Sequence, residues 1–280
     1  MKFFRRTTPK IGIALGSGAA RGLAHIGVLK ALKEAAIPID MVAGTSMGAL
    51  IGACFAKEGD IAVAEEMALK TDWKQVARLL DPNFRSLRKG LIHGRRLEEL
   101  LYSLIGDVGF KDLKIPFAAI TTDVNTGEEI TIREGSVIEA VRASISIPAI
   151  FVPIKLEGKF LVDGGLTNPV PTDVLLDMGA KFIIAVNVLT EPQKSKQAAS
   201  LLKESGPTAA PNILNTLIQS ITIMEHEIIK LKILKADIII NPDVSHIEAF
   251  EFYKGEEAIQ AGYEAATNIL PKLQRLIGKH

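Results

Sequence analysis

The sequence predicts an α/β protein whose central sheet is mainly parallel. Short buried apolar runs alternate along the chain with amphipathic helical patterns, which is typical of this class. The first segments follow the order strand, glycine loop, helix, strand, and this order predicts a βαβ unit. With 280 residues, 48% of them hydrophobic, the chain is long enough for one large domain or two small ones. We expect one domain over 10–280 after a tail at 1–9, because no linker divides the chain.

The βαβ unit is the best-defined part of the pattern. The apolar run 10–15 predicts a strand, and a glycine-rich loop follows it at 16–22. Apolar residues then recur at helical spacing from Leu23 to Ala36, before a second buried strand that ends near Ala43. The Ala- and Leu-rich run 47–56 predicts a buried helix.

The rest of the chain continues with strands and helices. Ser136 and Glu139 form the S-x-x-E pattern of a capping box, which predicts a helix start. The run 190–211 is polar and rich in Lys, Gln, Ser and Pro, so we expect a long loop. Other helices are predicted at 61–70, 95–105, 212–235 and 255–276, and strands at 115–124, 128–133, 154–162 (a hairpin), 181–189 and 236–241.

Composition excludes several functional classes. A formal net charge of +1 gives no global field that would attract nucleic acid. The single cysteine, Cys54, excludes a disulfide framework and a cysteine-based zinc cluster, and we expect it to be a buried small hydrophobic residue. The N-terminal ten residues lack the apolar core of a signal peptide. The uncharged run 41–56 is shorter than the roughly 20 residues that span a bilayer. We therefore expect a cytoplasmic protein.

The junction between the second strand and its helix carries the pattern G-T-S-M-G at 44–48. A G-x-S-x-G pentapeptide between a strand and a helix is the nucleophile elbow, in which Gly44 and Gly48 leave room for a sharp turn and Ser46 projects above the sheet. The turn also places Ser46 at a helix N-terminus, where free N–H groups favour an oxyanion. On the pentapeptide alone, an ordinary loop and helix cap is an equal alternative.

The glycine loop at 16–22 admits three interpretations. It lacks the third glycine spacing of a dinucleotide fingerprint and the Gly-Lys-Ser/Thr ending of a phosphate loop. It fits an oxyanion hole, because Gly16, Ser17 and Gly18 would present N–H groups at the sheet edge where Ser46 also emerges.

Two residues compete as the base for Ser46. Of the five histidines, only His246 has a plausible triad location, whereas His226 lies between Glu225 and Glu227 on what we expect to be a solvated helix face. Asp163 is delivered by a hairpin strand into a glycine-flanked turn, although Asp-Gly alone is an ordinary turn signal.

The ordered set of glycine loop, elbow and Asp163-Gly-Gly turn resembles the patatin-like phospholipase family. Further likeness lies in the segments 142–148 and 168–171, so that the resemblance covers about residues 10–190. It implies a three-layer α/β/α fold, cleavage of phospholipid or lysophospholipid esters, and a Ser46/Asp163 dyad that needs neither histidine, metal nor organic cofactor. Ser17 departs from the middle glycine of many members. The resemblance also assigns supporting roles to Arg21, Gly22, Gly44, Gly48, Gly164 and Gly165.

Two alternatives to this function stay open. One is a catalytically quiet member of the family with a regulatory or binding role, and the other is a Ser-His-Asp esterase that uses His246. The last 90 residues match the family less clearly, and they leave acyl-chain length, headgroup and oligomeric state open.

The stretch 73–96 predicts a cap, near 72–96, that contacts anionic membranes. Its basic residues are interleaved with apolar ones, which suits a lipid surface, and such binding should weaken with salt. A solvated face on an ordinary lid is the alternative. The basic residues are Lys74, Arg78, Arg85, Arg88, Lys89, Arg95 and Arg96, against the single acid Asp81.

Overall fold

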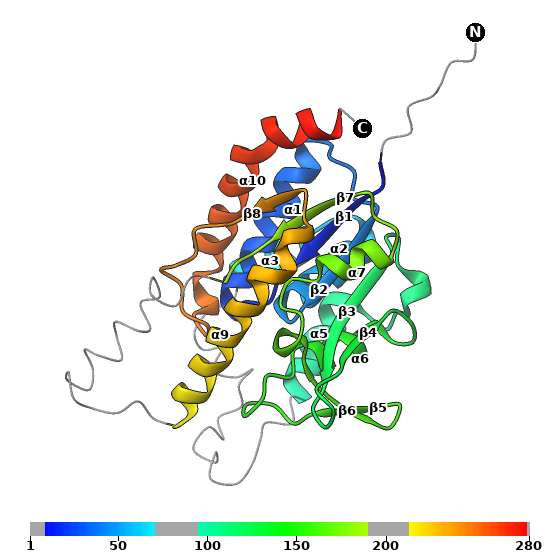
Figure 1. The fold of residues 1–280 in the computed structure, drawn as a ribbon, viewed down its shortest axis with the longest axis vertical. Coiled ribbons are helices and arrows are strands. Elements are labelled where there is room, and N and C mark those ends of the chain that lie inside the picture. The colour runs from blue at the N-terminus through cyan, green and yellow to red at the C-terminus, as the bar shows by residue number, and fades with distance from the viewer. Residues whose placement is uncertain (1–8, 71–94, 190–212, 279–280) are drawn as a thin grey trace, which may run out of the picture.

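A computed structural model describes residues 9–70, 95–189 and 213–278, and Figure 1 shows them arranged around one sheet. The strand order is β5-β6-β3-β2-β1-β7-β8, with β4 paired to β3. From β3 to β8 the neighbours on this path are parallel, whereas β4, β5 and β6 join antiparallel. The strands are β1 (Ile11–Leu15), β2 (Met41–Thr45), β3 (Phe117–Asp123), β4 (Glu129–Ile132), β5 (Ile154–Leu156), β6 (Lys159–Asp163), β7 (Phe182–Val186) and β8 (Ile238–Ile240).

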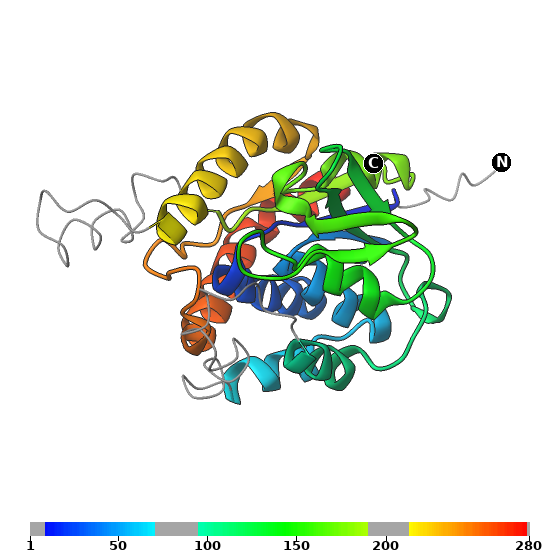
Figure 2. The ribbon, with the colours of Figure 1, turned by 90° about the horizontal axis from the view of Figure 1, so that it is seen from below.

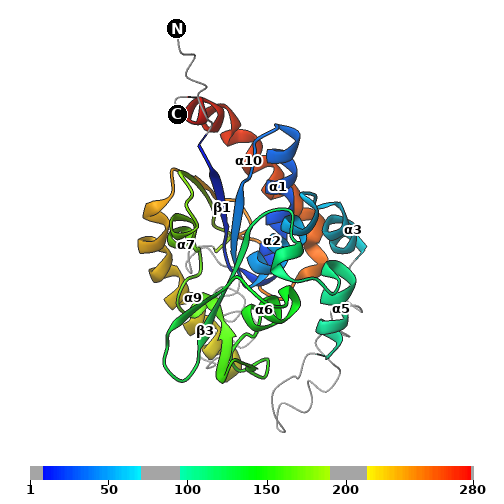
Figure 3. The ribbon, with the colours of Figure 1, turned by 90° about the vertical axis from the view of Figure 1, so that its right-hand side faces the viewer.

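Helices cover both faces of the sheet, which confirms the three-layer α/β/α fold (Figure 3). The larger apolar core lies between the sheet and α1, α2, α3, α5, α6 and α10, and a smaller one lies beneath α7 and α9. Figure 2, seen from below, shows α9 in yellow on the side of the sheet opposite α5. The α-helices are α1 (Ala24–Glu34), α2 (Met47–Glu58), α3 (Ala62–Lys70), α5 (Arg95–Ile105), α6 (Val137–Ser144), α7 (Thr172–Asp177), α9 (Ile213–Lys232) and α10 (Gly255–Ile277).

In the described residues, five short 3-10 helices connect these elements. Two of them differ from the predicted pattern, because the second half of the glycine loop is helical in η1 and the end of the long helix becomes η6. Their bounds are η1 (Ala19–Leu23), η3 (Phe110–Asp112), η4 (Gly164–Leu166), η6 (Ile233–Lys235) and η7 (Phe252–Lys254).

Most of the predicted elements are present within a few residues of their expected bounds. Ser136 caps α6, since its Oγ accepts from the N–H of Glu139 at 3.4 Å. Cys54 is buried, and burial raises the pKa of its thiol to about 12, so it acts as a small hydrophobic residue. The sequence did not predict α7, a helix of six residues. None of the helices in the described ranges is both long and apolar enough to cross a membrane.

Candidate active site

Strand register brings Ser46 and Asp163 together. Ser46 follows Thr45, which pairs with Ile120 of β3, and the next residue of β3, Thr121, pairs with Asp163 on the other side. The two side chains thus converge on one point of β3 from the strands that flank it. Ser46 Oγ donates a hydrogen bond to Asp163 Oδ2 at 2.6 Å, and both residues are buried.

The elbow holds Ser46 in a conformation that few residues adopt, with φ 55° and ψ −121°. The turn needs close backbone approach, since a Cβ on Gly48 would lie 2.1 Å from Leu15 O and one on Gly44 would lie 2.3 Å from Gly48 O. Ser144 fixes the strained residue, because its Oγ accepts from Ser46 N–H at 2.9 Å and donates to Ile120 O at 2.6 Å. Sequence reasoning did not find this role for Ser144.

Asp163 is held and desolvated by its surroundings. Its backbone N–H donates to Ser146 O at 3.0 Å, and its Oδ1 accepts from Gly165 N–H at 2.8 Å. Burial raises the pKa of Asp163 to about 6, although the hydrogen bonds from Ser46 and Gly165 favour the ionised form. The segment 142–148 therefore supports both members of the pair, through Ser144 for one and Ser146 for the other.

In the glycine loop, two of the three N–H groups that we expected to face an oxyanion are already bonded within the protein. The N–H groups of Gly16 and Ser17 already donate to Val186 O at 3.1 Å and Pro169 O at 2.8 Å, so they are used in packing the loop against the sheet. Within the described part of the chain, the N–H of Gly18 donates to no other group. Ala19 follows it as the first residue of η1, where helix N–H groups have no intrahelical acceptor.

Two histidines, His25 and His246, bear on the choice of base for Ser46. The Nε2 of His25 lies 2.8 Å from Gly16 O and must donate to that carbonyl, which braces the loop. Burial lowers the pKa of His25 to about 4, so the ring is neutral near neutral pH. His246 lies 3.2 Å from Glu257 Oε2 through its Nε2. No histidine of the described ranges lines either pocket beside Ser46.

Two pockets meet at Ser46. The apolar cavity, of about 150 Å³, runs between α2, α3 and α5. The carboxyl pocket, of about 60 Å³, lies between the glycine loop and α9 and contains Asp163 and Arg21. Ser46 is the single polar residue among those that line the apolar cavity in the described structure, and the others include Met47, Leu50, Ala64, Met67, Leu97, Leu100, Leu104, Phe151 and Phe250.

The remaining motif residues pack around these pockets. Arg21 is buried, and its Nε donates to Ile247 O at 2.7 Å. Burial lowers the pKa of Arg21, while the nearby carboxyls of Glu248, Glu225 and Glu251 favour its charged form. Gly22 and Gly164 allow close packing, because a Cβ would lie 2.4 Å from Met47 Cγ and 2.3 Å from Ile120 O, respectively.

Sequence reasoning missed Glu225. We expected its side chain on a solvated helix face. Instead it is only 9% exposed and lines the carboxyl pocket beside Ser46 and Asp163. A signal was present in the sequence, because Glu225 follows Ile221 and precedes Ile229 by four residues each, so that it shares their face of α9. Glu227, in contrast, is exposed and pairs with Lys230.

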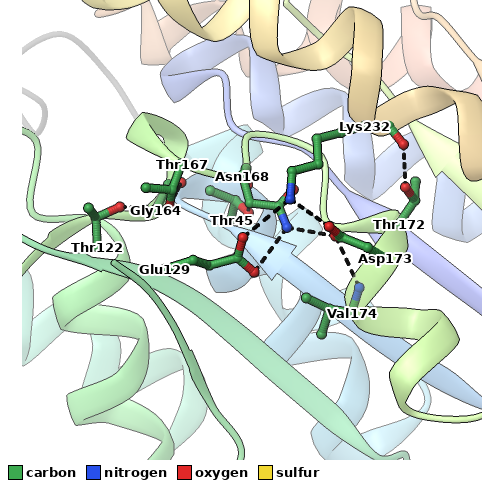
Figure 4. Close-up of polar contacts among 10 residues, drawn as sticks. All are labelled: Thr45, Thr122, Glu129, Gly164, Thr167, Asn168, Thr172, Asp173, Val174 and Lys232. Atoms are coloured by element: carbon green, nitrogen blue, oxygen red, sulfur yellow. Dashed lines mark hydrogen bonds and ion pairs between the residues drawn. The ribbon is translucent and has the colours of Figure 1, made fainter. Parts of the chain in front are cut away.

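A polar clamp, formed by Glu129, Asn168, Asp173 and Lys232, fixes α9 beside the site (Figure 4). Lys232 Nζ reaches Asp173 Oδ2 at 2.5 Å and Glu129 Oε2 at 3.3 Å, and the Asn168 amide donates to the same two carboxylates. Burial opposes the charge on Asp173, but its bonds to Lys232 and Asn168 prevail and lower its pKa. Thr45 donates to Asn168 O at 2.7 Å, which joins the clamp to the residue before Ser46.

The predicted cap near 72–96 lies almost entirely outside the described residues, which end at Lys70 and resume at Arg95. Both flanking helices, α3 and α5, contribute residues to the apolar cavity. The proposed membrane contact through this stretch stays a prediction.

Comparisons with known proteins identify relatives of the chain. Neuropathy target esterase sws of Drosophila melanogaster is 38% identical over 187 residues, which are 65% of this chain and 13% of that protein. An uncharacterised NTE family protein of Mycobacterium tuberculosis is 32% identical over 214 residues, 76% of this chain and 57% of that protein. The chain thus spans little more than half the length of the mycobacterial relative.

Structure and family comparisons agree with this likeness. VipD from Legionella pneumophila has a similar fold, with a TM-score of 0.51 at 13% identity over 95% of this chain and 67% of that chain. The family model for patatin-like phospholipases matches residues 13–176, more than half of the chain. The chain therefore belongs to the patatin-like phospholipase family.

Proposed function

We propose that the protein is a serine acyl hydrolase that cleaves carboxylic esters of lipids, with Ser46 as nucleophile and Asp163 as base. One observation carries the proposal: Ser46, whose Oγ donates a 2.6 Å hydrogen bond to the buried Asp163, also lines an apolar cavity. A nucleophile within hydrogen-bond reach of a base, beside a site for an apolar chain, is what acyl transfer from a lipid requires.

Acylation begins when Ser46 Oγ attacks the ester carbonyl carbon and its proton moves to Asp163. The tetrahedral intermediate then expels the alcohol, which takes the proton from Asp163, and the acyl group remains on Ser46. In the second half, water gives a proton to Asp163 and attacks the acyl carbonyl. The fatty acid leaves, and Ser46 recovers its proton from Asp163.

The oxyanion of each tetrahedral intermediate needs donors that the fold has not already used. Because Gly16 and Ser17 donate within the protein, we assign this role to the N–H groups of Gly18 and Ala19, which line the carboxyl pocket. Removing one such donor typically costs about 10²- to 10³-fold in rate.

Burial gives Asp163 the base strength that the reaction needs. An ordinary aspartate, with a pKa of about 3.9, is a weak base for a serine hydroxyl. Raising the pKa of Asp163 to about 6 moves it towards the operating pH while the carboxylate stays ionised at neutrality. Activity should therefore rise with pH through about 6.

The pockets on either side of Ser46 indicate how an ester would lie. An acyl chain fits the apolar cavity, where each buried methylene contributes about 0.8 kcal/mol. The alcohol half then lies towards Asp163 and α9. Lysophospholipids and phospholipids both present such an ester, and the family name of the relatives points to the same class.

The Ser-His-Asp alternative has less support, because His246 pairs with Glu257 and does not line either pocket. The quiet-member alternative is decided by activity. We expect the purified protein to release fatty acid from lysophosphatidylcholine, and Ser46→Ala to lose at least about 10³-fold of this rate with its circular dichroism unchanged. Equal rates for the variant and the wild type would refute the assignment, and no release by either would favour the quiet member.

A further inference from the structure

Glu225 is a buried carboxyl that the proposed mechanism does not use. It lies on the inner face of α9, in step with Ile221 and Ile229, and it is 9% exposed. The polar clamp holds the same face of the helix two turns further on, at Lys232. The packing of α9 thus directs the Glu225 side chain into the carboxyl pocket.

Two residues of the active-site motifs, Ser17 and Gly165, contact this carboxyl. Ser17 Oγ donates to Glu225 Oε1 at 3.0 Å, so the residue that departs from the family's usual glycine has a specific partner. On the other side, a Cβ on Gly165 would lie 1.9 Å from Glu225 Oε1. A glycine at 165 leaves space for the carboxyl where it lies, so Ser17, Gly165 and Glu225 pack against one another.

The charged groups that face Glu225 come from two other elements. Asp163 lies at the end of β6, and Arg21 lies on η1 with Glu248 and Glu251 close to it. On α9 itself the neighbours in sequence are His226 and the exposed Glu227. Burial, and then the charge of Asp163, raise the pKa of Glu225 to about 8, while Ser17 and Arg21 favour its ionised form.

We infer that Glu225 is a positioning residue of the active site, which in its protonated form holds the glycine loop through Ser17 without placing a second negative charge beside Asp163. The inference rests on the proposed function. A protonated carboxyl still accepts through its carbonyl oxygen, so the loop that carries Gly18 and Ala19 stays in place. An ionised Glu225 would repel the oxyanion that these N–H groups bind.

The test is the rate at which a fluorophosphonate probe labels Ser46 as a function of pH. In the wild type, this rate should fall about tenfold between about pH 7 and 9, because one group ionises there. Glu225→Gln keeps the acceptor but cannot ionise, so its rate should be about two- to fivefold lower at pH 7 and should not fall further by pH 9. Glu227→Gln is the matched control. Glu227 lies two residues further along the same helix, on its exposed face, so this variant should keep the wild-type profile.

A double-mutant cycle tests the contact itself at pH 7. Ser17→Ala and Glu225→Ala should each slow labelling by about tenfold, and the double variant should be no slower than either. Additive losses, or an alkaline fall in Glu225→Gln equal to that of the wild type, would overturn the inference. Absence of labelling in the wild type at every pH would count against the proposed function instead.

One readout needs no enzyme activity. Glu225 is protonated in the folded protein up to about pH 8 but ionises at about 4.5 when unfolded, so its contribution to stability is lost as pH rises. His25 opposes this trend only below its ordinary pKa of 6.5. Between about pH 6.5 and 8, the wild-type melting temperature should therefore fall by about 4 °C more than that of Glu225→Gln. Parallel curves would contradict the inference whether or not the protein is active.

Discussion

The two sides of Ser46 differ in the kind of side chain that forms them. The apolar cavity is walled by aliphatic, methionine and phenylalanine side chains, with Ser46 itself as the polar exception among its described residues. The carboxyl pocket contains Asp163, Glu225 and Arg21. In the proposed mechanism this division separates two tasks, since the cavity binds the acyl chain by excluding water and the carboxyl pocket holds the proton acceptor and sets the charge.

The division also follows the layers of the fold. Helices α2, α3 and α5 belong to the larger core and extend it up to Ser46 as the cavity wall. Helix α9 lies on the opposite face and brings Glu225 to the site from more than 170 residues further along the chain. Substitutions on the two sides should therefore affect activity differently. Those in the apolar cavity should change the preference for acyl-chain length, and those in the carboxyl pocket should change the pH dependence or the preference for the alcohol.

The largest expected effect after loss of Ser46 itself comes from the carboxyl pocket. Asp163→Asn preserves the shape of the side chain but removes the base, so ester hydrolysis should fall by about 10²-fold or more for short and long acyl chains alike. The rise of activity with pH through about 6 should disappear at the same time. Steady-state rates from pH 5 to 8 would show this. If His246→Ala were equally damaging without unfolding the protein, the base would be the histidine.

A smaller and more selective effect is expected in the cavity. Ala64 lines it from α3, and Ala64→Phe would place a ring where we propose that the acyl chain lies. We expect kcat/KM for long-chain p-nitrophenyl esters to fall by about tenfold, with a loss under about threefold for the butyrate ester. Val63→Phe is the matched control, because Val63 is 59% exposed on the same helix. Equal losses at all chain lengths would mean that the cavity does not hold the acyl group.

The smallest effect should come from the wall of α9. Thr222 lines the carboxyl pocket, and Thr222→Phe should reduce turnover of esters with bulky alcohols by about three- to fivefold, with the same acyl-chain preference as the wild type. Ser220→Phe, on the exposed face of α9, should have no such effect. A shift in acyl-chain preference in Thr222→Phe would show that the two pockets do not divide the ester as proposed.

The sequence was most informative where a short stretch of consecutive residues determines the local structure. The strand, glycine loop and helix near the N-terminus, and the elbow at Ser46, are local and were placed within a few residues. The turn at Asp163 was found as a pattern. Its distance from Ser46 depends on β3 lying between β2 and β6, which is a long-range pairing that no local pattern specifies.

What the sequence did not reveal depends on contacts between distant segments. The use of the Gly16 and Ser17 N–H groups is decided by β7 and Pro169, so an N–H that looks free in a glycine loop can already be bonded. Glu225 looked solvated beside Glu227, because helix phase alone does not say which protein surface a face meets. Helix α7, at six residues, is too short to give a periodic signal.

The most direct test of the central claim is the mass of the intact protein after brief exposure to a long-chain fluorophosphonate. The dyad predicts one adduct per chain, located on Ser46 by peptide mapping, with labelling at least about 10²-fold slower in Asp163→Asn and absent in Ser46→Ala. Ala64→Phe should slow labelling by the long-chain probe and spare a short-chain one. An adduct on another residue, or undiminished labelling of Asp163→Asn, would contradict the assignment of Ser46 and Asp163 as nucleophile and base.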